Sequence, residues 1–338
     1  MEFVEENVTS TALGPKEVII EVQALAINFK DCLTVLGQVD SDIIGSECAG
    51  IVRDVGANAE NDFKRGDRVV ACALDSYRTY LRCCTQSVAK IPAEMSFAEA
   101  TSFPTAFLTA LYSLVHVARL QKGESILIHA AAGGTGQAAV QMASRIGAEV
   151  FTTVGSQEKK TLLMERYGLS EHRIFYSRDA SFADGVEQAT KGCGVDVVLN
   201  SVSGLLLEAS WECVAPFGRF IGIGREDVDS RGRLTMYPFI KNLTFTGVDL
   251  TMVLDMKVEL GHQLLTEVMA LAQSGEIKPV FPLHLYPITD VERAFRFMQS
   301  GKSSGKIVLE INQSHVVPVS VSASRKFEEV LIAESCRL

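Results

Sequence analysis

The stretch that decides the fold is SILIHAAAGGTGQAAVQMASRIGAEVFTTVG, residues 125–155. It opens with a short apolar run, SILIHA (125–130), passes through a glycine-rich turn, and then has the apolar spacing of an amphipathic helix up to Gly147. A second apolar run, EVFTTVG (149–155), follows at once. A buried strand, a helix ended by glycine and a second buried strand form one βαβ unit, which predicts a parallel sheet covered on both faces.

The same alternation continues after this unit. Further short apolar runs, most of them separated by helical spacers, are RIFYS (173–177), DVVLNSV (196–202), RFIGIG (219–224) and LTFTGVDL (243–250). We therefore predict an α/β protein in which residues 106–255 form a doubly wound, Rossmann-type nucleotide domain.

The flanking regions have a different texture. Short strands punctuated by glycine, such as EVIIEVQALAI (17–27) and DRVVACAL (67–74), predict a β-barrel or sandwich before a helical stretch that breaks near Pro104. After a predicted helix at 256–275, short strands return around one helix and would complete that first domain. The predicted organisation is a discontinuous domain of residues 1–105 and 256–312, the nucleotide domain between them, and a tail or linker at 313–338.

Composition excludes several classes of protein. The chain is 47% hydrophobic and 22% charged, as in ordinary globular proteins, and its net charge of −9 argues against a nucleic-acid partner. No apolar run approaches the roughly 18–20 residues of a membrane helix, and the first residues do not resemble a secretory signal, so we expect a cytoplasmic protein. The eight cysteines form no C-x-x-C pair, and we expect no metal site.

The glycine-rich turn predicts a dinucleotide site. It lies between a strand and a helix, where the helix N-terminus offers free N–H groups to a pyrophosphate. Its A-A-G-G-T-G layout has Ala131 in place of the first glycine of the usual G-x-G-x-x-G pattern. Gly133 would let the backbone approach a phosphate, and Gly136 would let the helix pack closely on the strand.

The end of the next strand indicates which dinucleotide binds. NAD sites usually place an Asp or Glu about 20 residues after the glycine turn, where it bonds the ribose hydroxyls. Here that strand ends in Gly155 and Ser156, followed by Lys159 and Lys160. Because a carboxylate would repel a 2′-phosphate whereas a hydroxyl and lysines would bind it, we predict NADPH rather than NADH.

Several motifs taken together resemble the medium-chain dehydrogenase/reductase superfamily. They include INFKDCL (27–33), SECAGIV (46–52), the glycine turn and VLNSVSG (198–204). Within the superfamily, TTVGSQEKK (152–160), GRFIGIG (218–224) and KNLTFTGVDL (241–250) are most similar to enoyl reductase domains of fungal highly reducing polyketide synthases. The resemblance implies a GroES-like barrel for the first domain. It also implies a zinc-independent enzyme, since Ser46 stands where the zinc enzymes have histidine and no four-cysteine lobe is present.

The resemblance implies an NADPH-dependent reduction of an enoyl thioester carried on the phosphopantetheine arm of an acyl carrier protein. Hydride would go to the β-carbon, and the enolate would then be protonated at the α-carbon. The implied cofactor-binding residues are Ala131, Gly133, Gly134, Thr135, Gly136, Ser156, Lys159, Arg178, Asn200 and Ser201. Asn28 would lie at the cleft and donate to substrate or cofactor.

The proton donor is the least defined element of the resemblance. Where animal fatty acid synthase reductases have a lysine and an aspartate, this sequence has Arg225 and Thr251. Arg225 could stabilise an enolate but is a poor proton donor, since a guanidinium keeps its proton. Asp249, expected on the same side of a strand as Thr251, is a candidate substitute; Tyr77, Lys30 and water are the others.

Two other functions stay open on the sequence. One is a zinc-independent quinone or enone reductase, which would share the glycine turn and the phosphate-binding lysines. The other is a catalytically silent, NADPH-binding structural domain of a synthase. The resemblance further implies a homodimer through the nucleotide domain, in which the strand at 243–250 would pair with its twin; an apolar edge strand needs such cover.

Overall fold

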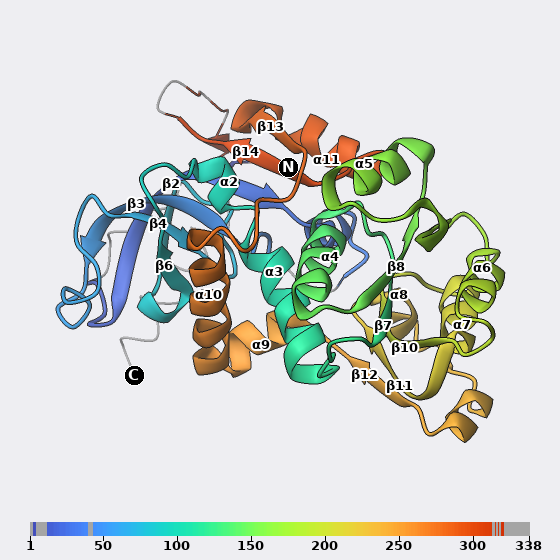
Figure 1. The fold of residues 1–338 in the computed structure, drawn as a ribbon. Coiled ribbons are helices and arrows are strands. Elements are labelled where there is room, and N and C mark those ends of the chain that lie inside the picture. The colour runs from blue at the N-terminus through green and yellow to red at the C-terminus, as the bar shows by residue number, and fades with distance from the viewer. Residues whose placement is uncertain are drawn as a thin grey trace, which may run out of the picture.

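The computed structural model describes residues 3–4, 12–39, 43–312, 315, 317 and 319–320. Two sheets dominate it and lie side by side, with helices packed between and around them (Figure 1). Most of the predicted tail at 313–338 lies outside the described residues. Among the described residues, no helix is both long enough and apolar enough to cross a membrane.

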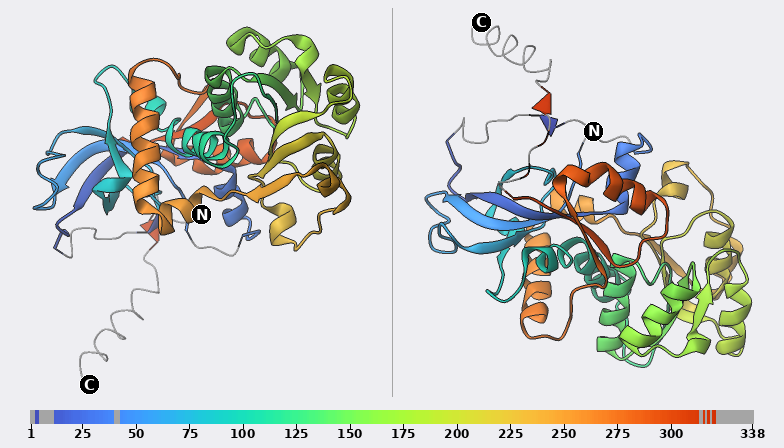
Figure 2. Two further views of the ribbon diagram at one scale, coloured as in Figure 1. Left: turned by 60° about the horizontal axis from the view of Figure 1, so that its bottom comes forward. Right: turned by 90° about the horizontal axis from the view of Figure 1, so that it is seen from above.

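The first sheet has seven strands, in the order β13-β14-β2-β3-β4-β6, with β5 paired to β2 as well. Their bounds are β2 (Glu17–Ile27), β3 (Cys48–Val55), β4 (Arg68–Ala71), β5 (Tyr80–Cys84), β6 (Val88–Lys90), β13 (Leu283–Pro287) and β14 (Lys306–Glu310). Strand β14 runs antiparallel to β2, so the end of the described chain completes the sheet that its beginning starts (Figure 2). The predicted barrel, closed by a C-terminal segment, is therefore present.

The second sheet is the predicted parallel one. Its six strands lie in the order β12-β11-β10-β7-β8-β9, and every pairing is parallel. They span β7 (Ser125–Ile128), β8 (Glu149–Val154), β9 (Ile174–Tyr176), β10 (Val195–Asn200), β11 (Val214–Gly222) and β12 (Thr244–Gly247). The strand order reverses between β7 and β10, which makes a crevice at their carboxyl ends the expected ligand site.

Helices cover both sheets and join them. Those of the parallel sheet are α4 (Gly134–Ile146), α5 (Gln157–Tyr167), α6 (Phe182–Ala189), α7 (Leu205–Glu212) and α8 (Glu226–Asp229). The others are α1 (Phe29–Val35), α2 (Phe97–Ala100), α3 (Pro104–Leu111), α9 (Leu250–Met256), α10 (Val258–Gln273) and α11 (Val291–Gln299). The remaining short elements are η1 (Thr85–Ser87), η2 (Tyr112–Val117), η3 (Glu171–Arg173), η4 (Tyr237–Lys241), η5 (Ile288–Asp290), β1 (Phe3–Val4) and β15 (Val319–Ser320).

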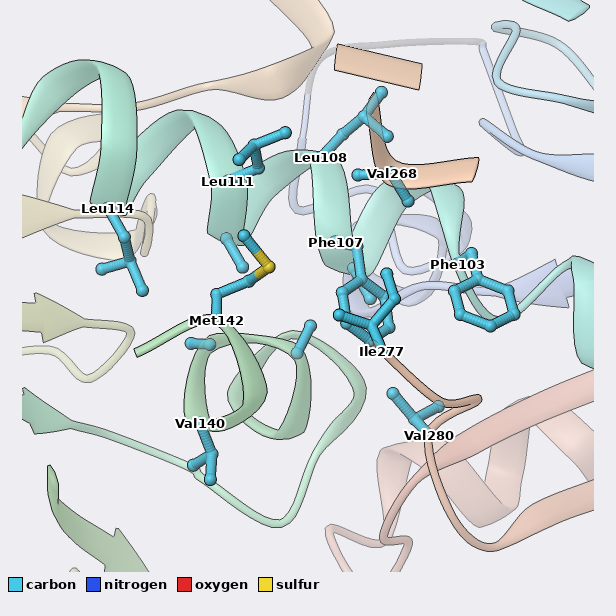
Figure 3. Packing of buried hydrophobic residues seen from close by; sticks show 14 of the residues in the cluster. Phe103, Phe107, Leu108, Leu111, Leu114, Val140, Met142, Val268, Ile277 and Val280 are labelled. Atoms are coloured by element: carbon cyan, nitrogen blue, oxygen red, sulfur yellow. The ribbon is translucent and has the colours of Figure 1, made fainter. Parts of the chain in front are cut away.

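The largest hydrophobic core joins the two halves. Helix α3 begins at Pro104, where the missing backbone N–H costs nothing because the first N–H groups of a helix have no partner within it. The break predicted near Pro104 is therefore the start of a helix. In Figure 3, Leu111 of α3 lies over Met142 of α4, and the ring of Phe107 lies against Ile277. Val268 of α10 lies beside Leu108 of the same helix α3. Helix α3 packs against both α4 of the nucleotide domain and α10, so the two halves of the molecule share one core.

One strand prediction was too long. The run 243–250 was expected to be a strand throughout, but β12 ends at Gly247 and α9 begins at Leu250. Asp249 is the N-cap of α9, and its carboxylate accepts a hydrogen bond from the backbone N–H of Thr251. Because N-capping by Asp favours a helix start, Asp249 and Thr251 lie at the beginning of a helix instead of on one face of a strand.

Candidate functional site

The glycine turn has the geometry of a phosphate cradle. Gly133 is the N-cap of α4. A Cβ on Gly136 would lie 2.4 Å from the carbonyl oxygen of Ala130 and 2.5 Å from the Cα of Ala131, so only glycine fits. Ala131 is buried and donates its N–H to Thr153 O at 3.1 Å, which fixes the turn on β8. The free N–H groups of this 13-residue helix can therefore receive an anion.

The end of β8 is open and flanked by cations. Gly155 has no atom within 4 Å of the place where a Cβ would stand, and Ser156 caps α5. The Nε of Arg178 donates to Gly155 O at 3.0 Å, and Lys159 Nζ donates to Gly301 O at 2.8 Å. Burial lowers the pKa of Lys159. Ser156 and Arg178 thus lie at the end of β8, whereas the ammonium of Lys159 is directed to the backbone of Gly301.

Lys160, the other lysine of this stretch, is engaged elsewhere. Its Nζ pairs with Glu171 at 3.2 Å and lies 5.6 Å from the ring centroid of Tyr176. The two adjacent lysines therefore differ. Lys159 makes no salt bridge within the described residues, whereas Lys160 has a carboxylate partner.

The end of β10 carries an unsatisfied acceptor. Asn200 is buried and donates from Nδ2 to Val202 O at 2.8 Å. Its Oδ1 has no hydrogen-bond partner in the part of the chain that the structure describes. Gly224 follows β11 and sits against the backbone of Ser201, which is exposed. A buried amide oxygen without a donor is costly, so this position suits a ligand that brings an N–H group.

A buried ion pair stands between the two sheets. Lys306 Nζ lies 2.6 Å from Glu47 Oε1, and the two side chains are only 5% and 0% exposed. Glu47 precedes β3 and Lys306 opens β14, while Glu47 Oε2 accepts from the backbone N–H of Thr105 in α3 at 2.7 Å. Three separate elements therefore depend on two buried charges.

Asn28 is part of this buried cluster. Its Oδ1 accepts from Lys306 at 2.5 Å, and its Nδ2 donates to Glu47 at 2.8 Å and to Ser46 at 3.2 Å. An ammonium can only donate and a carboxylate can only accept, so the orientation of the amide is fixed. Both amide hydrogens are engaged within the protein, so in this structure Asn28 fixes the start of α1 to the buried ion pair.

Asp31 fixes the same helix from its other side. It accepts from the backbone N–H of Asn28 at 2.7 Å and from that of Gly45 at 2.9 Å. Burial raises the pKa of Asp31 to about 6, against the opposing effect of these two N–H groups. The position of α1 is thus set by buried polar contacts.

Sequence reasoning missed Glu47 and Lys306. Both lie in apolar runs, SECAGIV (46–52) and GKIVLE (305–310). Charged residues are almost never fully buried unless they are paired. The pairing could have been suspected from one acidic residue in one predicted apolar strand and one basic residue in another.

Arg225 and Asp249 lie together where β11 and β12 end. The Arg225 guanidinium pairs with Asp229 at 3.1 Å and also with Asp249. Hydrogen bonding to Asp229 and the nearby charge of Asp249 raise the pKa of Arg225. Asp249 uses its second oxygen to cap Thr251 at 2.9 Å. The charge of Arg225 is therefore balanced by two carboxylates.

The other proton-donor candidates occupy different environments. The ring of Tyr77 packs beside Phe295 in the barrel, and its hydroxyl is buried without a partner among the described residues. Burial raises the pKa of Tyr77 well above its ordinary value. Lys30 instead reaches from α1 to α9, where its Nζ donates to Thr251 Oγ1 at 2.8 Å.

The described residues contain no group of three or more His, Cys, Asp or Glu side chains placed to hold a metal ion. Cys32 and Cys48 are free and buried, and burial raises the pKa of the Cys32 thiol to about 11. A neutral thiol is a weak ligand, because metals bind the thiolate.

Comparison with known proteins identifies both halves of the chain. Residues 14–113 match the alcohol dehydrogenase GroES-like domain, and 169–309 match the zinc-binding dehydrogenase family. Among solved structures, the chain is similar to the CurK enoyl reductase, with a TM-score of 0.82 and 34% identity over 91% of this chain and 94% of that one. It is also similar to mycobacterial Rv1454c complexed with NADPH, with a TM-score of 0.79 and 27% identity over 91% and 95%.

Curated relatives are much longer proteins. Highly-reducing polyketide synthase 1 of Aureobasidium melanogenum is 50% identical over 88% of this chain, which spans 14% of that protein. Squalestatin tetraketide synthase of a Phoma species is 45% identical over 89% of this chain, which spans 12% of it.

Removing one member of the Lys306–Glu47 pair should lower the free energy of unfolding. Lys306→Met leaves the Glu47 carboxylate buried without its cation, so we expect a loss of about 3–5 kcal/mol in the free energy of unfolding, measured with urea. Lys306→Met/Glu47→Gln removes the charge but keeps an acceptor for Thr105, and it should regain at least half of that loss. The control is Arg296→Met, whose partner Glu292 is 74% exposed and whose loss should stay below about 1 kcal/mol. Equal losses in the single and double variants would contradict this account of the pair.

Proposed function

The chain belongs to the family of polyketide synthase enoyl reductases, and from this we propose that it uses NADPH to reduce the α,β-double bond of an acyl thioester. The observation that carries the proposal is the buried Oδ1 of Asn200 at the carboxyl end of β10, for which the described part of the chain offers no hydrogen-bond donor. It lies on the same sheet edge as the glycine turn, and it suits the amide of a nicotinamide ring.

The residues along this edge fit the three parts of NADPH. The N–H groups at the start of α4, from Gly134 to Gly136, would hold the pyrophosphate, with Ala131 and Gly133 shaping the turn. Ser156, Lys159 and Arg178 would hold the 2′-phosphate, because the strand ends in Gly155 without a carboxylate and these residues supply one hydroxyl and two cations. The exposed Glu158 carboxylate, which now interacts with Ser156 and Arg178, would give way to the phosphate. Asn200 and Ser201 would hold the nicotinamide. The bound cofactor supplies a hydride.

The chain's own residues orient the substrate and manage charge. The buried cluster of Asn28, Glu47 and Lys306 fixes the start of α1 opposite the sheet edge. Arg225 and Asp249 remain proposed site residues. The ion pair of Arg225 with Asp249 fixes the loop after β11 against the start of α9, and Asp229 balances the charge of Arg225 further. Negative charge that develops on a thioester oxygen needs a cation that carboxylates do not already neutralise, so Arg225 would have to leave one of its aspartates to stabilise an enolate.

The substrate would arrive on an acyl carrier protein. The curated relatives are synthases of which this chain spans about a seventh, and a phosphopantetheine arm would reach the crevice from outside. We place this reaction in the cytoplasm, with no metal ion.

A second copy of the chain would cover β12. This strand is at one end of its sheet, and the adjoining η4 exposes large side chains, with Tyr237 and Ile240 both 73% exposed. An edge strand with apolar neighbours is a natural site for pairing with its twin.

The proposal is tested by NADPH oxidation at 340 nm with crotonyl-pantetheine or a longer enoyl thioester, run beside NADH and a small quinone. We expect turnover with the thioester and NADPH, and much less with the other pairs. Turnover of the quinone alone would instead favour a quinone or enone reductase. NADPH binding without any turnover would indicate a silent domain.

Cofactor choice should depend on two cations and not on their neighbour. Arg178→Ala and Lys159→Ala each remove a charge-assisted contact to the 2′-phosphate, so the KM for NADPH should rise roughly 10- to 100-fold while that for NADH changes little. Lys160→Ala is the matched control, since Lys160 is paired with Glu171. A larger effect at Lys160 than at Lys159 would contradict this assignment.

The dimer is tested by light scattering on purified chain. We expect a dimer that becomes a monomer in the Tyr237→Asp/Ile240→Asp variant, because two carboxylates would be buried in the interface. Leu285→Asp changes a half-exposed leucine on the other sheet and should leave the dimer intact. A monomeric starting protein, or a dimer that survives the double substitution, would argue against this surface.

A further inference from the structure

Lys30 makes a contact between the two domains. It belongs to α1, which follows β2 of the first sheet, and its Nζ donates to Thr251 Oγ1 at 2.8 Å. Thr251 belongs to α9, which follows β12 of the parallel sheet. The side chain therefore links a helix of the first domain to a helix that follows the parallel sheet.

Thr251, the acceptor of this hydrogen bond, lies at the part of the sheet edge where the nicotinamide is proposed to bind. The carboxyl ends of β10, β11 and β12 are neighbours, and they are followed by Ser201, Arg225 and Thr251 respectively. In a doubly wound sheet, this side of the switch point receives the half of a dinucleotide that is remote from the adenosine. Lys30 thus presents its ammonium group beside the proposed nicotinamide position.

Lys30 differs from the other candidate proton donors. Arg225 is paired with two aspartates, Asp249 has both oxygens engaged, and Tyr77 packs in the barrel. Among the described residues Lys30 makes no salt bridge, and its ammonium group bonds to the hydroxyl of Thr251. An ammonium has three hydrogens, so two remain after the bond to Thr251.

The neighbours of Lys30 and Thr251 suit an acyl chain. Phe29 is 64% exposed beside Lys30, and Met252 and Met256 on α9 are 58% and 67% exposed. Large exposed apolar side chains favour the binding of an apolar ligand. Lys30 and Thr251 therefore lie on two helices that each carry such side chains.

We propose that Lys30 is the catalytic proton donor to the α-carbon, with Thr251 as the residue that positions it; this rests on the enoyl reduction proposed above. The β-carbon receives a hydride from NADPH, leaving NADP⁺, and the electron pair of the double bond moves toward the thioester oxygen. The N–H bond of Lys30 then breaks, and its proton forms the new C–H bond at the α-carbon with that electron pair. The neutral amine is reprotonated by water.

The test uses tigloyl-pantetheine, whose reduction creates a stereogenic α-carbon. General acid catalysis contributes roughly 100- to 10,000-fold, so Lys30→Met should slow NADPH oxidation by at least 100-fold. Residual product should lose its single configuration at the α-carbon, because water can deliver a proton to either face. Lys30→Arg keeps the positive charge but replaces a proton donor by a guanidinium that keeps its proton, so it should be as slow as Lys30→Met. Because Lys30→Arg retains a long cationic side chain, it also serves as a control for any folding defect of Lys30→Met.

Thr251→Val should give a smaller loss of rate than the Lys30 variants. The control is Lys257→Met, since Lys257 is an exposed lysine at the end of α9.

A second readout needs no turnover. Lysine acetylation is followed by peptide mass spectrometry with NADP⁺, with and without the saturated 2-methylbutyryl-pantetheine. We expect the thioester to protect Lys30 at least fivefold and to leave Lys257 unchanged. Absence of protection would overturn the placement of Lys30.

The remaining outcomes also separate the hypotheses. Rates within threefold of the unmodified chain, or a slow reaction that keeps one α-configuration in both Lys30 variants, would overturn the donor role. If the unmodified chain reduces no enoyl thioester, the proposed function fails, while the protection experiment still decides whether Lys30 contacts the acyl group.

Discussion

The buried Lys306–Glu47 pair is the interaction on which the rest of the site depends. It joins the start of β14 to the start of β3, holds α3 through Thr105, and fixes Asn28 at the start of α1. The backbone just before Lys306 also contacts the glycine turn, since Gly305 N–H donates to Ala132 O at 2.8 Å. Because breaking a buried pair leaves an uncompensated charge, the turn and α1 are held in one arrangement.

Most of the fold could be predicted from the sequence because periodicity records burial. The run 125–155 specified the parallel sheet, and the return of short strands near the end of the chain indicated the closing strand β14. The prediction failed at 243–250, where apolar residues continue past the end of β12. There the backbone N–H of Thr251 donates to the Asp249 carboxylate and a helix starts, an effect that hydrophobic spacing does not register.

Candidate cofactor-binding residues could be named from the sequence where a motif or the end of a predicted strand marks them. The glycine turn, Ser156 and Lys159 lie within 30 residues of one another. Contacts between distant segments could not be inferred, such as Lys30 with Thr251 or Asn28 with Lys306, because each depends on how two domains pack. The sequence also suggested that Asn28 would face a ligand, whereas its amide is engaged by buried charges.

The central claim is that the substrate lies between α1 and the carboxyl edge of the parallel sheet. It is tested most directly by a crystal structure of the chain with NADP⁺ and a saturated acyl-pantetheine. The account predicts the 2′-phosphate against Arg178 and Lys159, and the α-carbon of the thioester within about 4 Å of Lys30 Nζ, the spacing of a reactive pair. A thioester bound away from α1, or a 2′-phosphate remote from both cations, would contradict it.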